Sequence, residues 1–278
     1  RIPEIYLKTV CDLDSTLLGM IKEKYQVPCI TSKYQELFSD PEIQGVVIST
    51  NENIQARLTI EALNAGKHVY VEKPLANTVE DCEAVVAAQK KTGKFVYVGF
   101  NRRFSPSYQK ARELIRSHGG AFNIHYRLSD GTNLCKNHGP VRYKRPSGSR
   151  VIYELCHIFD VFRWLTDSDV DSILCMDSRI DDEAYLLRMK SGCVATLMHS
   201  SYTTGDLPKE RLEVVAEAGY LTVDNFVELR TFGWKETSPV YTFPGHTHPD
   251  YEHTFRQKYL FEKLGADALY AILRTEWE

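Results

Sequence analysis

Short apolar runs alternate with amphipathic stretches over the first hundred residues. The apolar runs are rich in β-branched residues and lie at Ile5–Cys11, Val46–Ser49, His68–Val71 and Phe95–Gly99. Between them apolar side chains recur at helical spacing, and Gly66 and Gly93 follow two of these stretches, where a helix end favours glycine. Strands that alternate with helices predict right-handed βαβ units and a parallel sheet covered on both faces. We therefore predict an α/β, Rossmann-type doubly wound domain.

The pattern changes after Arg103. Helical patterns run from Pro106 to Ser117 and from about Val151 to Leu165. The remaining apolar segments read as strands and lie at Asn123–Arg127, Val170–Met176, Ala184–Lys190, Val194–His199, Leu212–Ala216, Tyr220–Val223 and Val240–Phe243. Short connections between them are typical of hairpins, so we predict a largely antiparallel, open sheet. The chain thus divides into an α/β domain over residues 1–103 and an α+β domain over residues 104–278.

Composition excludes several classes of protein. With 43% hydrophobic and 26% charged residues and a net charge of −3, the chain has the composition of a globular protein and lacks the basic surplus of a nucleic-acid binder. No apolar run approaches the roughly 18 residues that a membrane helix needs. Seven cysteines, with no CxxC pair, predict neither a disulfide framework nor a zinc ribbon. We expect a cytoplasmic protein that binds neither nucleic acid nor membrane.

Polar residues follow each predicted strand of the first domain, where open α/β sheets bind their ligands. They are Asp12, Thr50, Asn51, Glu72, Lys73, Asn101, Arg102 and Arg103. An acidic residue in the position of Asp12 can accept hydrogen bonds from a ribose 2′-hydroxyl, which favours NAD over NADP because a 2′-phosphate would meet a like charge. The other interpretation of Asp12 is an ordinary turn residue or helix cap.

Lys73 is the most informative of these residues. Pro74 restricts it to an extended backbone, so the lysine at this strand end is aimed at the ligand crevice. Its ammonium could donate to a substrate hydroxyl and stabilise the alkoxide that forms as hydride leaves the carbon. The alternative is a lysine at a solvated strand end.

The predicted helix from Val151 carries Glu154, His157 and Asp160 at successive three-residue steps, with Tyr153 four residues before the histidine. His157 could take a proton from an alcohol near neutral pH, and Glu154 could orient its ring. A half-buried structural histidine is the alternative. Separately, Arg102 and Arg103 could bind an anionic substrate or cofactor, and a solvated strand end is the alternative.

A histidine cluster near the end of the chain superficially resembles a metal site. It comprises His246, His248 and Asp250, with His253 beyond. A His-x-His pair beside a proline is typical of a loop, and no helix-spaced or cysteine partner supports zinc. We therefore expect no metal site.

Two segments resemble signatures of the Gfo/Idh/MocA oxidoreductases, a family named for glucose–fructose oxidoreductase and inositol dehydrogenase. They are Gly66 to Ala76, which contains Glu-Lys-Pro, and Gly99 to Pro106. His157 and Asp160 are similar to the family's substrate-domain helix, and the segments around Arg211–Val215 and Asp224–Phe226 resemble its later strands. The resemblance covers most of the chain.

The resemblance implies a Rossmann domain that binds NAD(P) and a C-terminal domain that binds substrate and often mediates oligomerisation. Residue by residue, Lys73 resembles the substrate-positioning lysine and His157 the proton-transfer histidine, with Tyr153 and Glu154 beside it. Asp12 resembles the ribose-binding acid. The cofactor would further contact Thr50, Asn51, Glu72, Lys73 and Asn101, and the substrate would contact Lys73, Arg103, His157 and Asp160.

Three departures from the family pattern stand out. No G-x-G-x-x-G occurs in the 278 residues, so the family's first strand and glycine-rich phosphate loop are expected to be missing from the first domain. Tyr153 stands where the family often has an aspartate, which leaves Glu154 as the partner of the histidine. The loop at Thr50 lacks the usual proline, and Gln55 replaces a common histidine. The chain is either a fragment of a normal enzyme or a degenerate member.

These observations predict an NAD(P)-dependent dehydrogenase that moves hydride between nicotinamide and a secondary alcohol of a sugar, a cyclitol such as inositol, or a related small molecule. NAD is favoured over NADP. Two alternatives are a glycoside-cleaving member that uses NAD transiently and a non-catalytic binding or scaffold relative. Because the open sheet of the second domain exposes one face, we expect a homo-oligomer, either a dimer or a tetramer.

Overall fold

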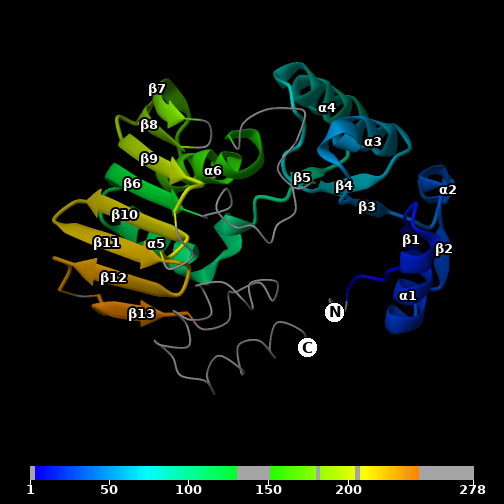
Figure 1. Cartoon of the computed structure of the whole chain (residues 1–278), viewed down its shortest axis with the longest axis horizontal. Coiled ribbons are helices and arrows are strands. Elements are labelled where there is room, and N and C mark those ends of the chain that lie inside the picture. The colour runs from blue at the N-terminus through cyan, green and yellow to red at the C-terminus, as the bar shows by residue number, and fades with distance from the viewer. Residues whose placement is uncertain (1–3, 130–150, 180–181, 204–206, 236, 244–278) are drawn as a thin grey trace. The chain divides into compact units, whose positions relative to one another are not determined.

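The computed structural model describes residues 4–129, 151–179, 182–203, 207–235 and 237–243. The chain divides into two compact units, Arg1–Phe100 and Asn101–Glu278, close to the boundary expected after Arg103. Figure 1 labels the elements of each unit along the chain.

The first unit is an α/β unit in which every strand pair is parallel, as predicted. Its elements are β1 (Thr9–Cys11), α1 (Ser15–Tyr25), β2 (Cys29–Thr31), α2 (Tyr34–Ser39), β3 (Gly45–Ile48), α3 (Glu52–Asn64), β4 (His68–Val71), α4 (Val79–Thr92) and β5 (Val96–Val98). The strands form two sheets, β1-β2 and β3-β4-β5, with no hydrogen-bonded ladder joining β1 to β3 among the described residues. The predicted first strand is shorter than expected, and the short elements β2 and α2 were not predicted because neither is long enough to show a period.

The helices of this unit begin at side-chain caps. The Asp14 carboxylate accepts the backbone N–H groups of Thr16 and Leu17 at the start of α1, and Thr78 caps α4 in the same way. α4 ends at Gly93, whose φ of 66° is the left-handed conformation that glycine adopts without strain. Helices α3 and α4 pack on the β3-β4-β5 sheet and bury apolar residues of α3, α4, β3 and β4 in one core (Figure 1).

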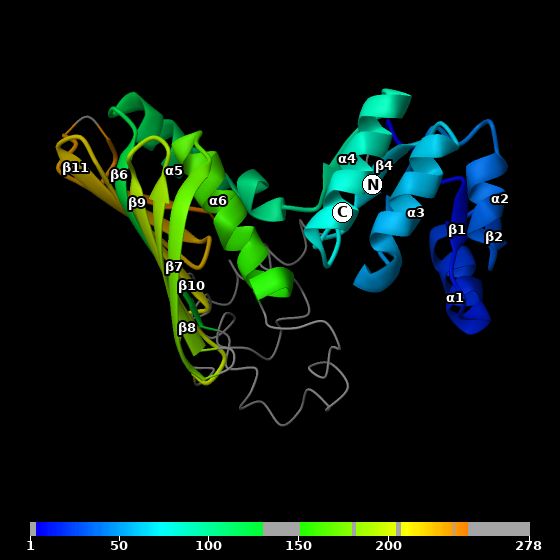
Figure 2. The same cartoon turned by 90° about the horizontal axis from the view of Figure 1, so that it is seen from above.

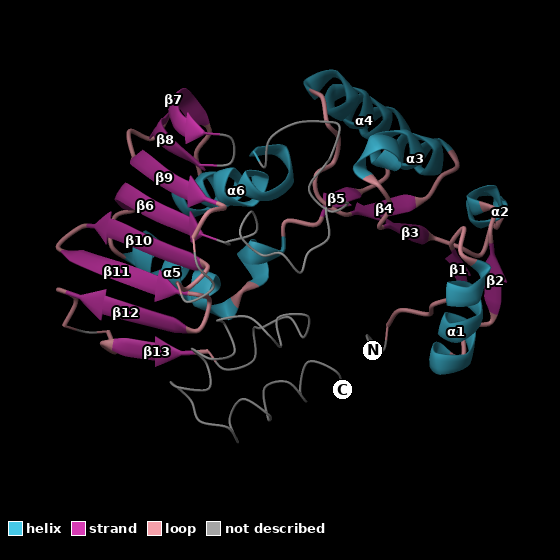
Figure 3. Ribbon diagram, in the orientation of Figure 1, coloured by secondary structure: helices cyan, strands magenta, loops and turns pink. Residues whose placement is uncertain are grey.

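The second unit contains an eight-stranded sheet that is antiparallel except at its centre. Its elements are η1 (Asn101–Phe104), α5 (Pro106–Ser117), β6 (Ala121–Ser129), η2 (Val151–Leu155), α6 (Cys156–Thr166), β7 (Val170–Arg179), β8 (Asp182–Met189), β9 (Val194–Ser200), β10 (Glu210–Ala216), β11 (Gly219–Asp224), β12 (Glu228–Phe232) and β13 (Val240–Thr242). The strand order is β13-β12-β11-β10-β6-β9-β8-β7, with β6 and β9 parallel (Figure 3). The predicted α+β class is therefore confirmed, and β12 is an additional strand.

Both α5 and α6 cover one face of this sheet (Figure 2). Tyr126 of β6 contacts both helices. Its hydroxyl lies 2.7 Å from that of Tyr108 on α5, and its ring packs edge-on against Phe162 of α6. The predicted helix from Val151 differs in one respect: its first turn, η2, is a π-helix and only the part from Cys156 is α-helical. Such single π-turns are rare and occur frequently at functional sites.

Two glycines with the same backbone conformation differ in the space around them. Gly233 has φ +91°, and a Cβ there would lie 2.4 Å from the carbonyl oxygen of Ala218, whereas Gly192 has φ +92° and nothing within 4 Å. Gly192→Ala is expected to cost about 1–2 kcal/mol from the left-handed backbone alone. Gly233→Ala should cost about 1–3 kcal/mol more, because a backbone oxygen cannot move aside as a flexible side chain can. Urea unfolding of the two variants measures the difference, and equal losses would contradict the steric argument.

Candidate active site

The carboxyl end of β1 presents an exposed carboxylate. The Asp12 side chain accepts the backbone N–H of Asp14 at 2.9 Å, and the Asp12 N–H donates to the Thr31 carbonyl at 3.2 Å. The cap of α1 is Asp14, so Asp12 is not needed as a helix cap. Its position just past a parallel strand is the one from which a carboxylate can accept a ribose hydroxyl.

The loop after β3 leads directly into α3. Asn51 is the N-cap of that helix, and its Oδ1 accepts the Asn53 N–H at 3.0 Å. The buried Gln55 side chain donates to the Thr50 carbonyl at 3.1 Å and ties the loop to the first turn. Thr50 and Asn51 themselves are exposed.

Glu72 is oriented by its neighbours at the carboxyl end of β4. Its carboxylate accepts the Lys73 backbone N–H at 3.3 Å and the Tyr70 hydroxyl at 3.4 Å, and the Lys73–Pro74 peptide bond is cis. Gly99, after β5, leaves room for this pair, since a Cβ there would lie 2.8 Å from the Tyr70 hydroxyl and 3.0 Å from Glu72 Oε2. Burial, together with Glu72, raises the pKa of Tyr70, which keeps the phenol protonated as a donor. Tyr70 was missed by sequence reasoning, although the two-residue period of a strand puts it on the same side as Glu72.

In the second unit, the predicted site residues lie at the junction of the π-turn and α6. Tyr153 and His157 are buried, and Glu154 is half-buried. Glu154, which was expected to orient His157, accepts hydrogen bonds from Lys209 at 2.7 Å and from Arg102 at 3.4 Å. Asp160 and Arg103, both expected to contact substrate, bind each other through two hydrogen bonds.

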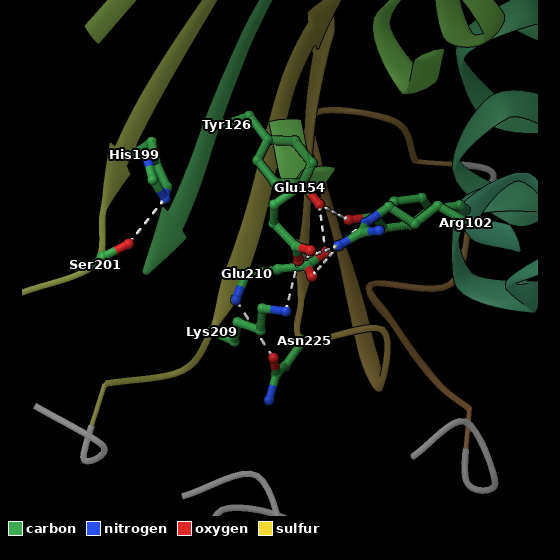
Figure 4. Close-up of polar contacts among 9 residues, drawn as sticks. Arg102, Tyr126, Glu154, His199, Ser201, Lys209, Glu210 and Asn225 are labelled. Carbon is green, nitrogen blue, oxygen red and sulfur yellow. Dashed lines mark hydrogen bonds and ion pairs between the residues drawn. The ribbon is translucent and has the colours of Figure 1, made fainter. Parts of the chain in front are cut away.

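Arg102 is the centre of a buried polar network at this end of the sheet (Figure 4). Its guanidinium donates to both carboxylate oxygens of Glu210, at 2.6 and 3.1 Å, and the Tyr126 hydroxyl donates to Glu210 at 2.6 Å. Burial opposes the charge of Arg102, yet Glu210 and the other neighbours raise its pKa well above the ordinary value. Burial and Glu210 likewise raise the pKa of Tyr126. Glu210 could not be identified from the sequence, because it lies 108 positions from its partner.

A second buried chain of polar groups was also missed. The Glu183 carboxylate lies 2.7 Å from Nδ1 of His199, and Nε2 of His199 lies 3.5 Å from the Ser201 hydroxyl. The Ser201 side chain is completely buried. The order acid, histidine, serine resembles a catalytic triad, but a nucleophile must reach its substrate, so we interpret the chain as internal pairing within the sheet.

The described residues contain no group of three or more side chains that could hold a metal ion. The cluster around His246 and His248 lies outside them. No helix in the described part of the chain is long and apolar enough to cross a membrane.

Comparison with known proteins gives a family match for each of the two units. A family model described as the oxidoreductase family with NAD-binding Rossmann fold matches residues 4–100, and the GFO/IDH/MocA C-terminal domain matches residues 108–222. The chain is 27% identical over 238 residues to myo-inositol 2-dehydrogenase of Thermotoga maritima, covering 82% of this chain and 70% of the relative. It is 26% identical over 236 residues to an uncharacterized oxidoreductase of Bacillus subtilis, covering 81% and 68%.

A solved structure shares the fold. The crystal structure of a probable dehydrogenase from Thermotoga maritima superposes with a TM-score of 0.72 at 25% identity, covering 79% of this chain and 68% of that one. The predicted family, fold class, oxidoreductase class and NAD-binding domain are thereby confirmed. The chain belongs to the Gfo/Idh/MocA family of oxidoreductases, with an NAD-binding Rossmann domain followed by the family's C-terminal domain.

Proposed function

We propose that this protein is an NAD-dependent dehydrogenase that oxidises a secondary alcohol of a cyclitol or sugar. The observation that carries the proposal is the Glu72-Lys73-Pro74 segment at the carboxyl end of β4, with Glu72 oriented by Tyr70 and by the Lys73 N–H. The relative from Thermotoga maritima named as a myo-inositol 2-dehydrogenase supports a cyclitol as the first substrate to test.

The residues at the strand ends fit the ribose and nicotinamide parts of NAD. Asp12 would accept the 2′-hydroxyl of the adenosine ribose, and its negative charge would repel the 2′-phosphate of NADP. Thr50, Asn51, Glu72 and Asn101 would line the rest of the cofactor site. The bound nicotinamide supplies a carbon that accepts hydride from the substrate.

Two side chains would handle the substrate hydroxyl. The Lys73 ammonium donates a hydrogen bond to the hydroxyl oxygen and stabilises the negative charge that develops on it as hydride departs. The His157 ring accepts the hydroxyl proton, a role that suits an imidazole near neutral pH. In the reverse direction His157 returns the proton to the carbonyl oxygen.

The direct test is a fluorescence titration of the full-length protein with NADH and NADPH, followed by absorbance assays of NADH formation with inositols and sugars. NADH is expected to bind about tenfold or more tightly than NADPH, a difference of about 1.4 kcal/mol, and Asp12→Asn should remove that preference. Failure of the full-length protein to bind either cofactor would overturn the proposal. Cleavage of a glycoside without net NADH formation would favour the glycoside-cleaving alternative, and cofactor binding with no activity would favour a scaffold.

We also propose that the face of the eight-stranded sheet that no described helix covers joins copies of the chain in a dimer or tetramer. Side chains at Leu174, Met176, Leu186 and Met198 point away from the helices and are 57%, 71%, 47% and 43% exposed. Strand register makes them neighbours, with Leu174 opposite Leu186 and the Met198 position next to Ala184. An apolar surface shared by three adjacent strands is typical of an interface rather than of a solvated face.

Light scattering at micromolar concentration is expected to show an oligomer for the wild-type protein and a smaller species for Leu186→Glu. Leu13→Glu is the matched control, because Leu13 is 90% exposed but belongs to the first unit and not to this sheet. A monomeric wild-type protein would contradict the proposed interface.

A further inference from the structure

Two carboxylates flank His157 along the chain, and each is bound by an arginine from the same short turn. Glu154 precedes the histidine by three positions and Asp160 follows it by three. Arg102 binds the first and Arg103 the second, and both arginines belong to η1, the first element of the second unit.

The contact on the N-terminal side is anchored in the sheet. Arg102 lies 3.4 Å from Glu154 Oε1 while its other hydrogen bonds join it to Glu210 at the start of β10 (Figure 4). Lys209 donates to the same oxygen of Glu154 at 2.7 Å. The side chain of Glu154 is only 16% exposed and that of Arg102 8% exposed, so water screens this contact little.

The contact on the C-terminal side is bidentate. Arg103 Nε donates to Asp160 Oδ2 at 2.7 Å, and its terminal nitrogen donates to Oδ1. The Asp160 side chain is 6% exposed. A planar guanidinium that grips both oxygens of a carboxylate restrains rotation as well as distance.

These contacts matter because the backbone before His157 is irregular. Val151–Leu155 form a π-turn and the α-helix begins at Cys156, so the α-helical hydrogen-bond pattern does not extend through the turn ahead of the histidine. Both carboxylates are already committed to cations. That commitment suits an anchor better than a proton acceptor.

We propose that Arg102 and Arg103 form a two-arginine clamp that sets the position and rotation of His157, with Glu154 and Asp160 as positioning residues. This inference rests on the proposed function, in which His157 moves the substrate proton. It replaces the expected roles of Glu154 as a catalytic partner and of Arg103 and Asp160 as substrate contacts.

The far end of α6 provides a matched control. Asp167 at its C-terminus pairs with Arg112 and Arg116 of α5, so Asp167→Asn also removes ion pairs from this helix, but far along the chain from His157. Its φ of 48° is a conformation that asparagine adopts readily, so the substitution adds no strain.

The kinetic test compares Glu154→Gln, Asp160→Asn and Asp167→Asn with myo-inositol and NAD. The first two are expected to lower kcat by about ten- to a hundredfold through misplacement of His157, with little change in KM. The limb of the pH profile that depends on His157 should remain, and Arg103→Lys should retain more activity than Arg103→Ala. The control variant should keep the wild-type kcat. The clamp would be overturned if Glu154→Gln and Asp160→Asn both kept the wild-type kcat. It would also be overturned if they lost the limb of the pH profile that the reference variant His157→Asn loses.

A second measurement does not depend on activity. Amide hydrogen exchange over residues 151–157 is expected to be about tenfold faster in Glu154→Gln, while β10 and β11 keep their protection and the control leaves the segment unchanged. Unchanged exchange in Glu154→Gln would overturn the clamp. If the wild-type protein neither binds NADH nor oxidises any alcohol, the proposed function fails, whereas the exchange data still decide the clamp.

Discussion

Lys73→Ala is expected to lower kcat for alcohol oxidation by about a hundredfold or more while the protein still folds and binds NADH. The ammonium is needed when negative charge develops on the substrate oxygen, so its removal raises the barrier more than it weakens ground-state binding. The loss should therefore appear in kcat, measured as initial rates at saturating substrate.

Lys91→Ala provides the control for this prediction. Lys91 is an exposed lysine in the last turn of α4, in the same unit, and its replacement changes the net charge equally. It should leave kcat at the wild-type value. A Lys73→Ala variant with the wild-type rate on a verified substrate would remove Lys73 from the mechanism.

Arg102→Met is expected to lower the free energy of unfolding by about 3–5 kcal/mol, because it leaves the Glu210 carboxylate buried without its cation. Glu210 is 1% exposed, and the Tyr126 hydroxyl that donates to it carries no positive charge. Folded domains have only about 5–15 kcal/mol of stability in total. The change should therefore be visible as a large shift of the urea midpoint.

Two further variants show how much of the stability loss comes from the buried charge and how much from the loss of an ion pair alone. Arg116→Met breaks an ion pair whose partners are 54% and 49% exposed, and it should cost less than about 1 kcal/mol. The double variant Arg102→Met, Glu210→Met should recover much of the loss, since it removes the buried carboxylate together with the arginine that compensates its charge. A loss in Arg102→Met no larger than in Arg116→Met would contradict the prediction.

The sequence by itself determined the alternation of the longer strands and helices in the first unit and was enough to propose where its chemistry lies. Alternation of apolar runs with helical periods follows from backbone geometry, so strands such as His68–Val71 and the helix ending at Gly93 were predicted close to their observed positions. Parallel strands bring their carboxyl ends to one edge, which is why the order of residues along the chain was enough to propose Asp12, Asn51 and Lys73 as site residues.

Only the tertiary structure decided which charges meet. Arg102 and Glu210 are 108 positions apart, and the parallel pairing of β6 with β9 within an otherwise antiparallel sheet depends on how whole strands share a core. The three-residue spacing suggested that Glu154 orients His157, but it could not show that Glu154 also contacts Arg102 or that Asp160 pairs with Arg103. Local spacing limits which side chains can share a helix face. Which of them are buried, and which distant cation compensates each buried charge, is set by packing between elements, and the chain encodes that packing only through its complete fold.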